Sequence, residues 1–224
     1  MRFTSVLFDL DGTLLNTIPD LTDGVNGMRM ALGLPPLRQD IVSTYVGKGS
    51  EVLVRRALQD NLRPEEPIEP QLLAQGMELF YQYYHTVNGD KTVIYEGVLE
   101  GLKAFREQGV KMAVVTNKPE EFTEPLLVST GLASFFEHAV SGDTCERKKP
   151  DPLPLHYACK LLDTRPQDTL MIGDSQNDVQ AARAADMAVV AVPYGYNEGQ
   201  GVQNLGADAI VSSIDEAALW AMQQ

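Results

Sequence analysis

The chain has 224 residues, 44% of them hydrophobic, which is enough for one or two domains with buried cores. Its formal net charge of -13 would repel nucleic acid and anionic membrane surfaces, so we expect neither as a partner and favour a small molecule. The two cysteines have neither disulfide-framework nor zinc-site spacing, and no apolar run reaches the roughly 18–20 residues of a membrane span, so we expect a cytoplasmic protein.

The first predicted element is a buried strand over the apolar run 5–10. Two carboxylates, Asp9 and Asp11, lie at its end in the segment DLDGT. Ligands of open α/β sheets bind at the carboxyl ends of strands, and Gly12 allows a sharp turn that directs backbone amides at an anion. The alternative is an ordinary loop with solvated acids.

The stretch 17–90 has no convincing strand pattern. Four runs show helical periodicity, separated by glycine- and proline-rich turns: 21–32, 39–46, 50–60 and 71–87. We therefore predict a small all-helical cap domain, 17–90, inserted into an α/β core of residues 1–16 and 91–224. Ligands often bind in the cleft between two such parts.

Strands and helices alternate after residue 95. Short apolar runs predict buried strands at 111–116, 138–141, 169–172, 188–192 and, more weakly, 209–211. Helical patterns lie between them at 96–108, 119–129, 151–162 and 175–185. Alternation of this kind predicts a Rossmann-like parallel sheet with helices on both faces.

Two of the loops in this half carry groups suited to phosphate. Thr116 and Asn117 follow a predicted strand and precede a helix, so they either hold phosphate oxygens or cap that helix. The segment RKKPDP places Lys148 and Lys149 in a positive cluster, which is unusual in so acidic a chain. The alternative for this cluster is a solvated basic turn.

The last candidate segment is GDSQND. Asp174 ends a predicted strand, and Asp178 follows four residues later on the first turn of a helix. Carboxylate oxygens of this kind suit Mg²⁺, although acids in a first turn also favour a helix through its dipole. All four segments end or follow strands and their chemistry is complementary, so we expect them to converge.

The four segments, in this order, resemble the haloacid dehalogenase superfamily of phosphatases. The resemblance covers essentially the whole chain, and the helical insert after DLDGT looks like the small cap of that superfamily. It is carried by Asp9, Asp11, Thr116, Lys149, Asp174 and Asp178. Three further segments, 31–37, 46–58 and 141–155, are similar to bacterial phosphoglycolate phosphatases.

This resemblance implies a Mg²⁺-dependent phosphatase that hydrolyses a small phosphomonoester, with 2-phosphoglycolate favoured. Asp9 would attack phosphorus and form an aspartyl phosphate, while Asp11 would protonate the leaving oxygen and then activate water. An oxygen of Asp9, the backbone carbonyl of Asp11 and the carboxylate of Asp174 would hold Mg²⁺. Asp178 would orient the lysine or bind a metal-ligated water.

The remaining roles concern phosphate and the rest of the substrate. Thr116 and Asn117 would bind phosphate oxygens, and Lys149, the lysine before proline, would offset the developing charge in preference to Lys148 or Lys118. Lys48, between Gly47 and Gly49, either meets a substrate carboxylate or lies in a tight turn.

Three other functions share these residues in whole or in part. A phosphosugar mutase would pass the phosphoryl group to a second hydroxyl, and a phosphate-binding regulator would have lost turnover. A dehalogenase would have no use for Asp11 or Mg²⁺. The sequence leaves the oligomeric state open between monomer and homodimer.

Overall fold

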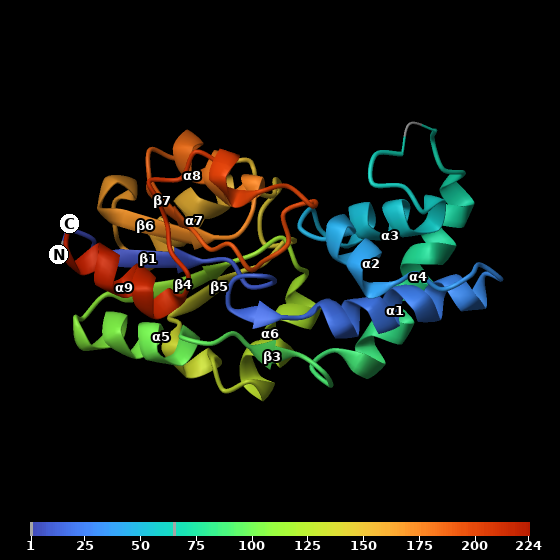
Figure 1. The fold of residues 1–224 in the computed structure, drawn as a ribbon, viewed down its shortest axis with the longest axis horizontal. Coiled ribbons are helices and arrows are strands. Elements are labelled where there is room, and N and C mark those ends of the chain that lie inside the picture. The colour runs from blue at the N-terminus through green and yellow to red at the C-terminus, as the bar shows by residue number, and fades with distance from the viewer. Residues whose placement is uncertain (1, 65) are drawn as a thin grey trace.

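The computed structural model describes residues 2–64 and 66–224. Figure 1 shows a sheet covered by helices, with the N and C marks at one end of the molecule and a second group of helices at the other end. The proline-rich turn indicated by the sequence at 64–70 includes Glu65, which lies outside the described residues. In the described part of the chain, no helix combines the length and apolarity needed to cross a bilayer.

The sheet has six parallel strands in the order β5-β4-β1-β6-β7-β8. They are β1 (Ser5–Phe8), β4 (Lys111–Val115), β5 (His138–Val140), β6 (Thr169–Gly173), β7 (Ala188–Ala191) and β8 (Ala209–Ile210). Phe8 is in register with Val114 of β4 and with Ile172 of β6. The residues that follow these three central strands therefore emerge at one edge of the sheet.

Helices cover both faces of the sheet, as the alternating pattern predicts. Val6 and Phe8 pack on one face beneath α5 (Val98–Glu107), α6 (Glu120–Ser129) and α9 (Ile214–Met222). Leu7 points the other way, towards α7 (Leu153–Leu162) and α8 (Gln176–Ala184). Because successive strand residues face opposite sides, a strand covered on both faces must be largely apolar, and the residues of β1 after Ser5 are all apolar.

Four helices form what we call the helical block: α1 (Ile18–Ala31), α2 (Gln39–Tyr45), α3 (Ser50–Gln59) and α4 (Pro70–Val87). They pack around a core that includes Met28, Val54 and Phe80. The helices α1 and α4 pack closely, because a Cβ at Gly27 would lie 2.4 Å from the ring of Tyr83. A side chain at Gly27 would therefore force these two helices apart.

The sequence indicates linkers on both sides of the helical block, but not that they pair. β2 (Leu15–Asn16) and β3 (Val93–Ile94) form a short antiparallel ladder there. Two-residue strands are too short to leave a periodic pattern in a sequence. The buried carboxylate of Asp20 adds to this junction, accepting hydrogen bonds from the backbone N–H groups of Gly89, Lys91 and Thr92 at 2.8–3.0 Å.

Candidate active site

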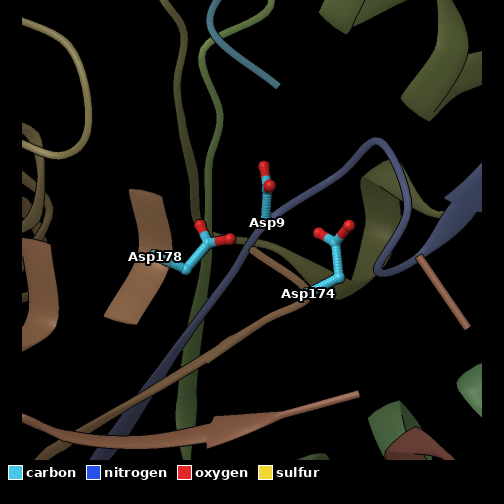
Figure 2. A group of neighbouring side chains, drawn as sticks. All are labelled: Asp9, Asp174 and Asp178. Carbon is cyan, nitrogen blue, oxygen red and sulfur yellow. The ribbon is translucent and has the colours of Figure 1, made fainter. Parts of the chain in front are cut away.

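Three carboxylates converge at the edge of the sheet where β1 and β6 end. Asp9 directly follows β1, Asp174 directly follows β6, and Asp178 lies on the first turn of α8. Each offers an oxygen within 4.8 Å of the others, and Figure 2 shows the three side chains grouped around one point. The sequence-based expectation that Asp9 and Asp174 are close enough to share one ion agrees with this geometry.

Lys149 lies between two of these carboxylates. Its side chain is 1% exposed, and its Nζ is 3.0 Å from Asp9 Oδ1 and 2.7 Å from Asp178 Oδ1. Nζ also donates to the carbonyl of Val115 at 2.6 Å. Asp178 is held in turn by the N–H and hydroxyl of Ser175, through its other oxygen. The lysine is thus fixed where it offsets charge on Asp9.

Asn117 holds the backbone of that lysine. Its Oδ1 accepts from the N–H of Lys149 at 3.0 Å, and its Nδ2 donates to the Lys149 carbonyl at 2.9 Å. Nδ2 also donates to the carbonyl of Gly47 in the helical block at 2.9 Å. The structure therefore gives the side chain of Asn117 a positioning task, whereas the sequence assigned it to phosphate.

The electrostatics of the acidic group are unfavourable without a cation. The pKa of Asp9 is raised from 3.8 to about 7, mainly by burial and also by the charge of Asp178, although Lys149 lowers it. Burial also raises the pKa of Asp174 well above its ordinary value, and the charges of Asp9 and Asp178 act in the same direction. A bound divalent cation would relieve this repulsion, because it favours the ionised carboxylates.

Asp174 is held by residues that the sequence analysis did not single out. Its Oδ1 accepts from the hydroxyl of Thr13 at 3.0 Å, and its Oδ2 accepts from the backbone N–H of Tyr196. Two glycines leave it room: a Cβ would lie 2.5 Å from Oδ2 at Gly12, where φ is +87°, and 2.2 Å from it at Gly195. The loop after β7 could have been found by the same rule of strand ends that identified the others.

Tyr196 also reaches the helical block. Its hydroxyl oxygen accepts from the backbone N–H groups of Thr17 at 2.9 Å and Ile18 at 3.3 Å, where α1 begins. The same hydroxyl donates to Asn16 Oδ1 at 2.9 Å. One residue thus contacts both the acidic group and the first linker.

A small cavity opens beside Asp9, between the strand ends and the helical block. Its walls are largely apolar, with a few polar groups, and its volume is ≈ 40 Å³. The lining residues include the apolar Leu21, Leu53, Phe80 and Phe122 and the polar Asp9, Asp11, Thr116 and Lys118. The size of the cavity suits a ligand of few atoms.

Asp11 and Thr116 both border this cavity, as the sequence predicts for groups that contact substrate. Asp11 is outside the three-carboxylate group, and its Oδ1 accepts from the hydroxyl of Thr17 at 2.7 Å. The hydroxyl oxygen of Thr116 accepts from the N–H of Lys118 at 3.2 Å. Since that bond uses a lone pair of the oxygen, the Thr116 proton remains free to be donated to a ligand.

Lys48 and Lys118, the two other lysines considered from the sequence, lie in different surroundings. Lys48 is not among the residues that line the cavity, because its Nζ pairs with Glu198 Oε1 at 2.8 Å. Its neighbours Gly47 and Gly49 do line it. Lys118, the weakest of the three cations proposed for the charge-offsetting role, is buried in the cavity wall.

The chain has extensive similarity to known proteins. Residues 6–192 match the family model described as haloacid dehalogenase-like hydrolase. The chain is 47% identical over 215 residues to the phosphoglycolate phosphatase of Thiobacillus denitrificans, covering 96% of this chain and 94% of that protein. It is also 47% identical over 213 residues to the phosphoglycolate phosphatase of Nitrosospira multiformis, with 95% and 93% covered.

The fold is shared with solved structures. A crystal structure described as a predicted phosphoglycolate phosphatase from Haemophilus somnus superposes with a TM-score of 0.91 at 32% identity, covering 100% of this chain and 99% of that one. One described as a putative phosphoglycolate phosphatase from Lactobacillus delbrueckii gives 0.88 at 29% identity, with 97% and 98% covered. The similarity thus includes the sheet, the helical block and the connections between them.

Proposed function

The chain belongs to the haloacid dehalogenase-like hydrolase family, and we propose that it is a Mg²⁺-dependent phosphatase that hydrolyses 2-phosphoglycolate to glycolate and phosphate. One observation carries the proposal. Asp9 faces the cavity with its Oδ1 held by the N–H of Leu10 at 2.8 Å and by Lys149 at 3.0 Å, so its second oxygen is oriented for attack. The names of the relatives support the substrate.

The residues present fit a divalent cation. Asp9 and Asp174 supply buried carboxylate oxygens, the donors that Mg²⁺ prefers, and their raised pKa values reflect a repulsion that such an ion removes. In our proposal the backbone carbonyl of Asp11 completes the protein ligands. When bound, the ion would neutralise charge between the attacking carboxylate and the phosphate oxygens.

The reaction proceeds in two displacements. Asp9 attacks phosphorus, the bond from phosphorus to the ester oxygen breaks, and that oxygen takes a proton from Asp11. Asp11 then removes a proton from water, which attacks the aspartyl phosphate and releases inorganic phosphate and free Asp9. Thr116 donates a hydrogen bond from its hydroxyl to a phosphoryl oxygen, and Lys149 offsets the charge on the equatorial oxygens.

We propose that the helical block, within residues 17–90, acts as a cap on a catalytic core of residues 1–16 and 91–224. The support is that the cavity wall combines residues of both parts, such as Leu53 and Phe80 from the block and Thr116 from the core. A wall shared in this way excludes water from the reacting groups when the parts are together.

A phosphate-release screen over small phosphomonoesters, with and without Mg²⁺, tests the proposed function. We expect the highest kcat/KM with 2-phosphoglycolate, no need for a sugar bisphosphate, and activity that is lost with chelator and restored by Mg²⁺. Release from none of the esters would contradict a phosphatase. Phosphoryl transfer to a sugar hydroxyl in place of release would favour the mutase alternative.

Cation affinity should depend on pH because of Asp9. Its pKa is raised to about 7 in the metal-free protein, so below pH 7 the carboxyl is protonated and must lose its proton to bind an ion. We expect Mg²⁺ affinity to rise by at least about tenfold per pH unit up to pH 7, because Asp9 must lose a proton and the pKa of the second ligand, Asp174, is raised as well. Calorimetric titration with Mg²⁺ at pH 6, 7 and 8, in buffers of different ionisation enthalpy, measures both affinity and proton release. A pH-independent affinity with no proton release would show that the ion does not displace a proton there.

A further inference from the structure

Lys118 is a buried cation that the mechanism above does not use. Its side chain is 3% exposed, and its Nζ is 2.7 Å from the hydroxyl of Tyr84 and 3.3 Å from Asp11 Oδ1. Nζ also lies 4.7 Å from the centre of the Tyr84 ring. Burying an ammonium group without a negative partner is costly. Because Lys118 lies in the cavity wall, that partner can be Asp11 or an anionic group of a bound ligand.

The backbone of Lys118 is held tightly. Its N–H donates to the Thr116 hydroxyl, and its carbonyl accepts from the N–H of Gly142 at 2.7 Å. A Cβ at Gly142 would lie 2.2 Å from the carbonyl oxygen of Asn117, so the two loops touch at this point. The ammonium group is therefore placed in advance, at little further cost in conformational entropy when a ligand binds.

Lys118 lies where the group attached to the ester oxygen of the substrate would be. Phosphate lies by proposal at Asp9 and Thr116, and the ester oxygen lies at Asp11, which would protonate it. Whatever is attached to that oxygen lies past Asp11, where Lys118 is 3.3 Å away. Among the described residues that line the cavity, Lys118 is the only one with a positive charge, and much of the remaining wall is apolar.

We propose that Lys118 binds the carboxylate of the substrate and makes the enzyme select phosphoesters with a carboxylate on the ester carbon. The inference rests on the proposed phosphatase function. A small cavity requires the second anionic group to be close to the phosphate, and Lys118 lies only two residues along the chain from Thr116. The Tyr84 hydroxyl, which contacts the same ammonium, fixes it from the side of the helical block.

A substrate pair tests this without any mutation. Ethyl phosphate has a methyl group where 2-phosphoglycolate has its carboxylate. We expect kcat/KM of the wild-type enzyme to be about 10- to 100-fold higher for 2-phosphoglycolate, as is typical for a buried charge-assisted hydrogen bond. Hydrolysis of neither ester would refute the proposed function itself. Equal kcat/KM for both would leave that function standing and overturn the role of Lys118.

The Lys118→Met variant locates the preference. It should raise KM for 2-phosphoglycolate about 10- to 100-fold and lower kcat/KM for this ester about 10- to 100-fold more than kcat/KM for ethyl phosphate, and Lys118→Arg should restore part of the difference. Equal losses for both esters would show that Lys118 acts through Asp11 instead. A selective loss in Lys48→Met, with none in Lys118→Met, would assign the carboxylate to Lys48.

Two controls support this comparison. Lys103→Met removes an exposed lysine of α5 and should change neither ester's kinetics. Circular dichroism and thermal unfolding check that Lys118→Met is folded. If it is not, the neutral Lys118→Gln variant carries the test, and unchanged selectivity and KM in that variant would contradict recognition by the ammonium group.

Discussion

The Asp9→Asn variant is expected to lose at least about 10⁴-fold in kcat, as is found when the nucleophile of a covalent mechanism is removed. An amide of the same shape keeps one oxygen for the N–H of Leu10 and for Lys149, but it has no anionic oxygen to attack phosphorus. The fold should remain intact, because the change also removes one of three crowded negative charges. Phosphate release and thermal unfolding measure the two effects.

The intermediate provides a second readout for the same residue. Borohydride reduces an aspartyl phosphate to homoserine, so mass spectrometry of wild-type enzyme quenched during turnover should find homoserine at position 9. The matched control is Asp90→Asn, which changes an exposed acid and should retain activity. Near-normal turnover in Asp9→Asn, or a modified residue elsewhere, would assign the nucleophile to another side chain.

The Lys149→Met variant should be both inactive and unstable. It leaves Asp9 and Asp178 buried without the cation that lies 3.0 Å and 2.7 Å from them. Breaking a buried ion pair by removing one partner typically costs about 3–5 kcal/mol, and we expect a loss of that size in the free energy of unfolding at pH 8 without metal. Urea denaturation followed by circular dichroism measures it.

The pH dependence of that loss has a definite sign. Burial already raises the pKa of Asp9 to about 7, and removing Lys149 removes the interaction that lowers it. The folded variant therefore binds a proton more tightly than its unfolded chain does, so its stability falls as the pH rises towards and above 7. The difference from wild type should shrink at pH 5. Lys148→Met, at the exposed neighbouring position, should change stability little at either pH.

The main features of the site could be predicted because they depend on position along strands. Buried parallel strands leave continuous apolar runs, and their carboxyl ends meet at one edge of the sheet. Asp9 and Asp174 follow two adjacent strands in register, so their meeting is a consequence of the runs that precede them. Asp178 joins them because it lies on the first turn of α8, and a helix that follows a strand begins at the same edge of the sheet.

Other features depend on contacts that leave no local pattern. Lys48 belongs to a glycine-rich turn typical of anion sites, yet it pairs with Glu198, a residue 150 positions away in a loop. The sequence correctly places Asn117 after a strand, but only the fold shows that its side-chain amide forms hydrogen bonds with the backbone of Lys149. The α9 helix lies beyond 209–211, the last segment for which the sequence predicts an element.

The contacts of Tyr196 have a mechanical consequence. Its main chain holds Asp174, while its side chain holds the start of α1, the first helix of the block that closes the cavity. A swing of α1 away from the sheet must therefore either break the bonds to the phenol or pull on the segment that fixes Asp174. In the proposed enzyme, substrate entry and metal binding would therefore be coupled through Tyr196, and a spectroscopic probe ion bound at Asp174 would respond when the helical block moves.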